Sequence, residues 1–348
     1  MEEMLTAIGR ELVQRQDYIP PTVETIYFGG GTPSLLSSQQ TGRLLNQIRK
    51  QFNVAAGAEI TLEANPEDIN ERKARALADL GINRVSLGVQ SFHDPILQKL
   101  NRQHSGRQAG KAIAVLQNQG IANLTIDLIY GIPGQDTSAW EDNLQQALAL
   151  NVPHLSCYAL TIEEKTALGN WQRKGKFKAA DEAAYEEQYR LMCQILAARG
   201  YAHYEVSNFA RPGFTSRHNM AYWQQKPYLG VGPGAHSYQG KSRQFNISHN
   251  ARYIKALKQG TPWYQQETLN KTQVFNEYLL TGLRTSQGID FNYIRQAFNR
   301  DIYSIHRPFI ERCLSEGKAT LADGKFVLKD NALILADSVI VELMMDDQ

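Results

Sequence analysis

Consecutive glycines end an apolar stretch near the start of the chain. The run Ile26-Tyr27-Phe28-Gly29-Gly30-Gly31-Thr32-Pro33 predicts a β-strand that breaks off at the glycines. Glycine lets the backbone come close to a ligand and present its N–H groups to it. The end of this strand is therefore predicted to be a binding surface, with Gly30, Gly31 and Thr32 as its candidate contacts.

Polar residues recur where further apolar strands are expected to end. Glu63 and Gln90 each directly follow an apolar run, and Asp127 lies inside one. In parallel β/α folds the carboxyl ends of the strands form the ligand crevice, so these side chains are expected to face one site together with the glycines. Two alternatives stay open: Glu63 caps the helix after Asn65-Pro66, and Asp127 pairs with a buried cation.

The cysteines offer little chemistry by their spacing. Cys157, Cys193 and Cys313 are scattered along the chain, which fits neither a disulfide framework nor a metal-ligand cluster. Cysteine is among the most buried residue types, so these are interpreted as buried free thiols.

Length and charge narrow the class of protein. With 348 residues, of which 42% are hydrophobic, the chain can form a large domain and a smaller one. A formal net charge of +2 gives no reason to expect nucleic acid or an anionic membrane as a partner. The sequence shows neither an apolar run of about 18 residues nor the apolar core of a signal peptide, so a cytoplasmic location is expected.

The elements that must position the candidate residues alternate between strand and helix. Between the strands lie amphipathic helices, whose ends are marked by cap signals such as Asn70, Gly81, Ser105 and Gly120 and by Asp94-Pro95. This alternation predicts parallel strands with right-handed crossovers, either a TIM-like barrel or an open doubly wound sheet. The candidate strands are Thr25–Phe28, Glu59–Glu63, Arg84–Val89, Asn123–Ile129, His154–Leu160 and Ala202–Val206.

A helix is predicted before the first strand. Leu5, Ile8, Leu12 and Val13 form its apolar face, and no strand precedes it. Such a helix is half of a β/α unit, and a missing strand would leave an unpaired sheet edge beside Thr25–Phe28. The architecture therefore leads to the hypothesis of an N-terminal truncation.

The chain from about Lys271 onward is predicted to be a separate small unit. It combines helical runs at Val274–Leu283 and Tyr303–Glu316 with strands Ala319–Leu321 and Lys325–Leu328, which Asp323-Gly324 joins in a hairpin. This order suggests a winged-helix shape. The unit carries slightly more acidic than basic residues, so DNA binding is not expected.

Several motifs in this order carry a family resemblance. Together they resemble the radical S-adenosylmethionine (SAM) proteins of the oxygen-independent coproporphyrinogen III oxidase group. Within that group, the H-N-x-x-Y-W sequence inside Arg217–Trp223 is similar to the heme chaperone (HemW) branch. The motifs are Gly29–Pro33, Glu63–Pro66, Gly88–Phe92, Asp127–Gly134 and Gly232–His236.

The resemblance implies a fold and a domain organisation. Residues 1–240 would form a partial TIM-like parallel β/α barrel of the radical SAM type, without its first strand and cysteine loop. Residues 241–270 would connect it to a C-terminal winged-helix-like domain, 271–348, which packs over the barrel opening and helps to enclose a porphyrin.

The resemblance also implies SAM contacts. Gly30 and Glu63 match positions that hold a first SAM, and Gly31 and Thr32 match a second SAM position found in the oxidase. The positions around that second SAM correspond to Gln90, Arg102 and Asp127. There a guanidinium can hold a carboxylate in bidentate fashion, and Asp127 can accept from ribose hydroxyls. The alternative for Arg102 is a merely solvated side chain ahead of a helix.

His218, Tyr222 and Trp223 are the candidate heme contacts. A neutral imidazole can ligate heme iron, and the two aromatic rings could stack on the macrocycle. The alternatives are an ordinary surface histidine and an aromatic pair that closes a core. His236, after Gly232–Ala235, is a weaker candidate on the SAM side.

One departure from the family pattern bears on mechanism. The family binds a [4Fe–4S] cluster through C-x-x-x-C-x-x-C, and the cysteines of this chain cannot replace that motif. Radical chemistry belongs to the cluster and SAM together, so the chain as it stands is not expected to perform radical catalysis. A start of translation misassigned to an internal Met1, with the strand and cysteines upstream, is the preferred explanation.

Three functions follow from the resemblance. The favoured one is a heme chaperone whose partners are heme and an unknown heme-acceptor protein, with contact to membrane-associated heme proteins. The alternatives are a coproporphyrinogen III oxidase, which carries out radical SAM oxidative decarboxylation in porphyrin biosynthesis, and a non-catalytic remnant without a cluster. Enzymatic activity is left open.

Overall fold

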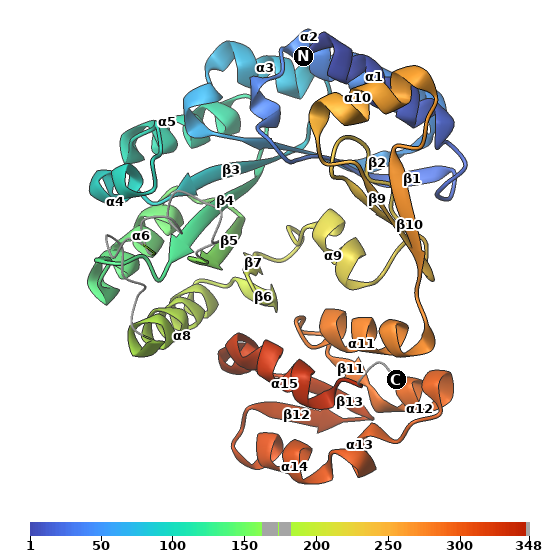
Figure 1. Cartoon of the computed structure of the whole chain (residues 1–348). Helices are drawn as coiled ribbons and strands as arrows, with labels where there is room; N and C mark the ends of the chain where they lie inside the picture. Colours follow the sequence, from blue (N-terminus) through green and yellow to red (C-terminus); the bar gives the residue numbers. More distant parts are fainter. Residues whose placement is uncertain (162–172, 174–181, 346–348) are drawn as a thin grey trace.

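A curled sheet of seven strands forms the first two thirds of the molecule (Figure 1). The structure is a computed structural model that describes residues 1–161, 173 and 182–345. The strand order is β1-β2-β3-β4-β5-β7-β6, and the first five strands pair in parallel. This confirms the predicted partial parallel β/α barrel. These five strands are β1 (Thr22–Phe28), β2 (Asn53–Ala64), β3 (Arg84–Gln90), β4 (Asn123–Tyr130) and β5 (His154–Ala159).

Helices cover the outer side of the curl. They pack on a core made by every second strand residue, such as Leu62, Leu87 and Ile126. The residues between them face the inner side and are polar: Glu63 is paired in register with Ser86, and Asp127 with Ser156. The helices whose side chains belong to this core are α2 (Ser38–Gln51), α3 (Glu71–Asp79), α5 (Gly106–Asn118), α6 (Thr137–Ala149) and α8 (Glu182–Ala198). Helix α1 (Glu2–Gln14) packs on α2, and the short α4 (Asp94–Lys99) precedes α5.

The predicted cap signals lie where these helices begin and end. Ser105 and Gln108 form a capping box at the start of α5, and Asn70 accepts from the backbone of α3. Gly81 and Gly120 follow α3 and α5 with φ of +84° each, a conformation that suits glycine.

The sheet departs from the prediction after β5. α8 (Glu182–Ala198) leads into β6 (Ala202–Glu205), as expected, but β6 does not pair with β5. A three-residue strand, β7 (Asn208–Ala210), lies between them and is antiparallel to both. The chain reverses directly after β6, and a strand this short leaves no periodic signal in the sequence.

The leading helix α1 is present, and it joins the barrel to a second, antiparallel sheet. Leu5 and Leu12 are buried as predicted. Val13 is 47% exposed, because it does not lie on the face of the helix that is buried. β1 lies at the edge of the sheet. Its only strand partner in the described chain is β2, and α9 (Arg217–Trp223) lies against it.

The predicted connecting segment 241–270 has regular structure. β8 (His236–Tyr238), β9 (Ser242–Asn246) and β10 (Tyr264–Thr268) form a three-stranded sheet, and α10 (Asn250–Gln259) packs against α1. The buried Glu11 of α1 accepts from the backbone N–H of Gly232 at 2.9 Å and from Asn246 Nδ2 at 2.7 Å. These bonds tie the second sheet to the first helix.

The C-terminal unit has its own apolar core, centred on buried residues such as Phe275, Leu279 and Phe326. Asp323 and Gly324 both have positive φ and form the hairpin turn, as predicted. The predicted helix Tyr303–Glu316 is interrupted at His306, since Pro308 stands in the first turn of a new helix. The elements are α11 (Lys271–Gly282), β11 (Ile289–Asp290), α12 (Phe291–Phe298), α13 (Ile302–Ile305), α14 (Arg307–Ser315), β12 (Ala319–Ala322), β13 (Lys325–Leu328) and α15 (Ala336–Leu343).

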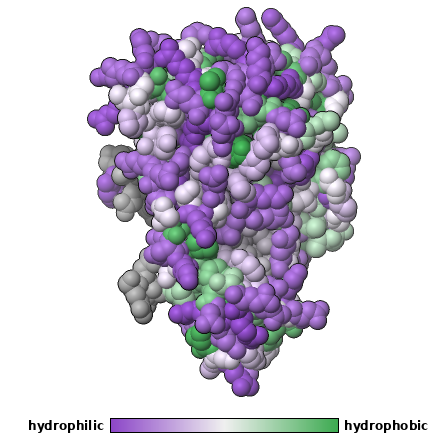
Figure 2. All heavy atoms as spheres, turned by 90° about the vertical axis from the view of Figure 1, so that its right-hand side faces the viewer, coloured by the Kyte–Doolittle hydropathy of each residue, from purple (hydrophilic) through white to green (hydrophobic). Residues whose placement is uncertain are grey.

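This unit lies on the open side of the curled sheet, across from the covering helices (Figure 1). Tyr189 of α8 donates to the Asp330 carbonyl at 2.7 Å, and Glu205 of β6 forms a backbone bridge with Thr285. The face in Figure 2 is mainly hydrophilic, with hydrophobic side chains in small groups. No helix of the described residues has the length and apolar character needed to cross a membrane.

Candidate functional site

The end of β1 is open and lies beside a carboxylate. Gly30 and Gly31 have φ of +71° and +63°, and a Cβ on either would meet no atom within 4 Å. Glu63 Oε2 accepts from the Gly30 N–H at 3.1 Å, and Glu63 Oε1 accepts from the Tyr27 hydroxyl at 2.7 Å. The Glu63 carboxylate therefore faces the glycines and does not cap the turn after Asn65. Thr32 follows directly, ahead of the 3-10 turn Pro33–Leu35.

Gln90 and Arg102 gather around Asn65. Gln90 is buried at the end of β3 with φ of +66°, a strained conformation of the kind that clusters at functional sites. A Cβ on Gly88 would lie 2.9 Å from Gln90 Nε2 and 3.5 Å from Asn65 Oδ1, so both amides lie close above Gly88. Arg102 Nη1 donates to Asn65 Oδ1 at 3.5 Å. Arg102 is half-buried, and it is not merely solvated.

Asp127 lies on the same inner face. Burial, with the negative charge of Glu63 adding to it, raises the pKa of the Asp127 carboxyl to about 7, although the Ser86 hydrogen bond and Arg102 oppose the rise. Ser86 Oγ donates to Asp127 Oδ1 at 3.2 Å. The buried cation Arg84 pairs with Glu59 at 3.9 Å instead. The predicted strand-end residues thus come together on one side of the sheet.

This arrangement fits the chemistry of SAM. Carboxylates suit an ammonium group and sugar hydroxyls, and a guanidinium suits a carboxylate. The open glycines leave space for a ligand next to backbone N–H groups, which a Cβ would narrow.

His218 lies against β1, on the same inner face. Its Nδ1 is 2.9 Å from Thr25 Oγ1, its Nε2 is 3.0 Å from Tyr222 Oη, and its ring stacks on Tyr27 at 4.7 Å and 13°. Burial lowers the pKa of His218 to about 4, so the imidazole is neutral near pH 7. It is therefore not an ordinary surface histidine.

Further aromatic rings lie next to His218 and extend away from it. Tyr222 is 42% exposed and stands edge-on to both His218 and Tyr228, at ring distances of 4.9 and 4.6 Å. Trp223 is half-buried and ends α9. The exposed ring of Tyr222 covers Nε2, the ring nitrogen that a metal could reach once the ring moves aside.

A buried ion pair holds α9 in place. The Glu59 carboxylate accepts from the backbone N–H groups of Arg217 and His218 at 3.2 and 3.0 Å. Arg84 is in turn fixed by Asn123 Oδ1 and Thr125 Oγ1, at 2.7 Å each. The strands of the barrel thereby set the position of the His218 ring.

Several residues of the site were not predicted from the sequence: Thr25, Tyr27, Glu59, Arg84 and Ser86. A signal for them exists in the strands. Polar and apolar residues alternate along much of β1 to β4, so one face of each strand carries most of its polar residues. This alternation places Thr25, Tyr27, Glu59, Arg84 and Ser86 on the same face as Glu63 and Asp127.

The remaining candidates lie apart from this site. His236 is exposed on β8, next to Phe245. Cys157, Cys193 and Cys313 are free thiols on β5, α8 and α14. Cys157 and Cys313 are buried as predicted, whereas Cys193 is half-buried, so the prediction was wrong for this residue. In the part of the chain that the structure describes, no three His, Cys, Asp or Glu side chains gather to hold a metal ion. These residues do not fit a [4Fe–4S] cluster.

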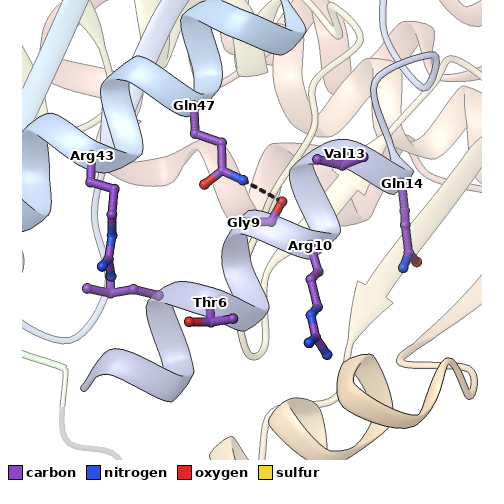
Figure 3. A pocket seen from close by; sticks show the side chains of 8 residues that line it. Thr6, Gly9, Arg10, Val13, Gln14, Arg43 and Gln47 are labelled. Carbon is purple, nitrogen blue, oxygen red and sulfur yellow. Dashed lines mark hydrogen bonds between the residues drawn. The ribbon is translucent and has the colours of Figure 1, made fainter.

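A separate hollow of about 460 Å³ lies between α1 and α2, on the outer side (Figure 3). Gln47 Nε2 donates across it to the Gly9 carbonyl at 2.8 Å. None of its lining residues is a predicted site residue: Leu5, Thr6, Gly9, Arg10, Val13, Gln14, Arg43 and Gln47.

Comparison with protein families identifies two regions. Residues 8–147 match the model of the radical SAM superfamily, and residues 269–335 match the HemN C-terminal domain. The second match coincides with the C-terminal unit.

Comparison with individual proteins extends this result. The heme chaperone HemW of Lactococcus lactis is 40% identical over 267 residues, which cover 77% of this chain and 70% of the relative. HemW of Bacillus subtilis is 32% identical over 305 residues, which cover 87% of this chain and 80% of the relative. The structure of coproporphyrinogen III oxidase (HemN) from Escherichia coli matches 99% of this chain and 83% of its own, with a TM-score of 0.83 and 21% identity. At that identity the match concerns the fold.

Proposed function

The chain belongs to the HemW family of radical SAM proteins, and we propose that it binds heme and transfers it to an acceptor protein. The proposal rests on the environment of His218. Its imidazole is neutral, stacked on Tyr27 and bonded to Thr25 through Nδ1, and its Nε2 is bonded to the hydroxyl of the partly exposed Tyr222.

Heme would bind on the side of α9 that carries the exposed ring of Tyr222. A neutral Nε2 is a suitable axial ligand for iron, and Nδ1 keeps its bond to Thr25, which fixes the ring. Iron ligation requires the Tyr222 hydroxyl to leave Nε2. A hydrogen bond of this kind contributes about 0.5–1.5 kcal/mol, so its loss is a small cost. The rings of Tyr222 and Trp223 would then stack on the macrocycle.

SAM would bind at the carboxyl ends of β1 to β4. Gly30 and Glu63 would hold a first SAM, with the carboxylate of Glu63 opposite the ligand ammonium. Gly31, Thr32, Gln90, Arg102 and Asp127 would surround a second. When bound, SAM supplies an activated sulfonium. No part of the proposed function depends on a [4Fe–4S] cluster.

The proposal includes the partners and the place of action. The acceptor would be a heme protein, including one attached to a membrane, and the transfer would take place in the cytoplasm. The coproporphyrinogen oxidase alternative has in its favour the fold and the residues that match the second SAM position of the oxidase, whereas the His218 motif favours the chaperone.

A hemin titration followed by absorption spectroscopy tests the proposal. Hemin should give a shifted Soret band with the wild-type chain, and His218→Ala should weaken binding at least about tenfold, the effect of roughly 1.4 kcal/mol. His306→Ala, on the C-terminal unit, is the matched control and should bind like wild type. An unshifted wild-type spectrum, or full binding by His218→Ala, would contradict the assignment.

A further inference from the structure

We propose that Tyr27 couples the two candidate ligand sites, so that SAM and heme each raise the affinity of the protein for the other. The inference rests on the proposed function, because it assumes that Glu63 contacts SAM and that His218 contacts heme. It adds a route between the two ligands through one side chain.

Tyr27 touches both sites at once. Its ring lies almost parallel to the His218 imidazole, with ring centroids 4.7 Å apart, and its hydroxyl donates to Glu63 Oε1 at 2.7 Å. Thr25, two residues earlier on the same face of β1, binds His218 Nδ1. A displacement of the Tyr27 ring would therefore move a contact of each site.

Tyr27 and Glu63 contact each other over the Gly29 backbone, so a movement of one side chain displaces the other. A Cβ on Gly29 would lie 2.5 Å from Tyr27 Cε1, 2.9 Å from Tyr27 Cδ1 and 3.0 Å from Glu63 Oε1. The tyrosine ring and the carboxylate thus both lie close over the glycine backbone. His218 covers the ring in a stacked arrangement, and Glu63 holds the hydroxyl.

The coupling should be positive, because the Glu63 carboxylate can accept a further hydrogen bond from a ligand. Its two oxygens accept from Tyr27 and from the Gly30 N–H, and the side chain is half-buried. A ligand ammonium on the same carboxylate would immobilise it, and with it the Tyr27 hydroxyl and ring. The ligand at His218 would then have less conformational entropy left to lose, which gives positive cooperativity. By linkage, heme must tighten SAM binding by the same factor.

Hemin titrations of the full chain with and without saturating SAM test the proposal. In the wild type, SAM should tighten hemin binding at least about fivefold, and hemin should tighten SAM binding in equilibrium dialysis by the same factor. Tyr27→Phe keeps the stacked ring and removes the Glu63 bond, so the factor should fall below about twofold.

A matched variant and a second perturbation sharpen the test. Tyr130→Phe removes another strand hydroxyl, bonded to Tyr185 at 3.2 Å and not to either site, and should keep the wild-type factor. Gly29→Ala keeps the Tyr27 hydroxyl but pushes on its ring, and should also reduce the factor. It supplies the answer if Tyr27→Phe does not fold.

The outcomes separate the two proposals. If the wild type binds hemin and SAM independently, or if Tyr27→Phe and Gly29→Ala both keep the full factor, the coupling is refuted and the heme chaperone function stands. If the wild type binds no hemin at all, the proposed function itself fails and the coupling fails with it.

Discussion

Asp127 illustrates how the inner sheet face sets the charge of a single group. The carboxyl lies among the strands, close enough to Glu63 for the two negative charges to repel each other, and its pKa rises to about 7. Near neutral pH the group is therefore partly protonated. It can donate or accept a hydrogen bond toward a ligand hydroxyl.

Replacing Asp127 by Asn should change the pH dependence of stability. The folded-state pKa of about 7 lies above the ordinary value of 3.8, so the stability that this carboxyl contributes is fully present below about pH 4 and is lost between about pH 4 and pH 7. Asp127→Asn should therefore raise Tm, relative to wild type, more at pH 8 than at pH 5. Thermal unfolding followed by circular dichroism measures this difference. The exposed Asp79→Asn serves as control, and an equal or smaller gain at pH 8 would speak against the assignment.

Tyr222 should slow the binding of heme, because its hydroxyl is hydrogen-bonded to His218 Nε2, the nitrogen that we propose as the iron ligand. Tyr222→Phe keeps the ring and frees Nε2, so hemin association should accelerate by about two- to tenfold, as loss of one modest hydrogen bond implies. Stopped-flow absorption at the Soret band measures the rate. Tyr293→Phe, exposed on α12, should match wild type. A slower association in Tyr222→Phe would mean that the hydroxyl assists binding.

The sequence predicted which residues gather at the carboxyl ends of the strands. It did not predict Tyr27, which connects Glu63 to His218. Gly30, Glu63 and Asp127 could be found because parallel strands bring their carboxyl ends to one edge. Tyr27 could not be recognised in the same way, since its partner His218 is distant in the sequence and reaches it only through the position of α9.

The position of the His218 motif depends on a buried ion pair between two neighbouring strands, β2 and β3. Arg84 and Glu59 are both buried on the inner face, and Glu59 carries the first backbone N–H groups of α9. A short helix of this kind has little stability of its own, so its position comes from these contacts.

Breaking this pair should therefore be costly. Arg84→Met leaves Glu59 buried without its cation and should lower the free energy of unfolding by about 3–5 kcal/mol. Arg43→Met is the matched control, since its pair with Glu2 is exposed to solvent and its loss should hardly change the free energy of unfolding. Urea denaturation gives both values. Equal effects of the two substitutions would show that Arg84 does not hold the inner face.

The sequence predicted the five parallel strands and several helix caps because these have local signals. It did not predict β7, which has only three residues, or the interruption at His306. The sheet of β8 to β10 was also missed, since its strands are short and become ordered by packing on α1 through Glu11.

At the scale of the whole molecule, two apolar cores form separate units. One lies between the curled sheet and its outer helices, and the other lies inside the C-terminal unit. The sequence predicted both units from their element order. Side-chain contacts such as that between Tyr189 and Asp330 have no local signal, and they fix the second unit on the open side of the sheet.

A core substitution in the C-terminal unit should act mainly there. Leu279→Ala removes a fully buried side chain and should destabilise that unit by about 2–5 kcal/mol. Every tryptophan of the chain precedes residue 271, so tryptophan fluorescence should hardly change while calorimetry shows an earlier transition. Leu77→Ala, in the barrel core, should instead shift the fluorescence transition. A single transition that moves equally in both variants would contradict independent cores.

A crystal structure of the protein with hemin and SAM bound would test both proposed ligand sites at once. We expect heme iron on His218 Nε2, with the Tyr222 hydroxyl displaced, and SAM at the carboxyl ends of β1 to β4 in contact with Gly30 and Glu63. Heme ligated by another residue, or SAM bound away from these strand ends, would contradict it.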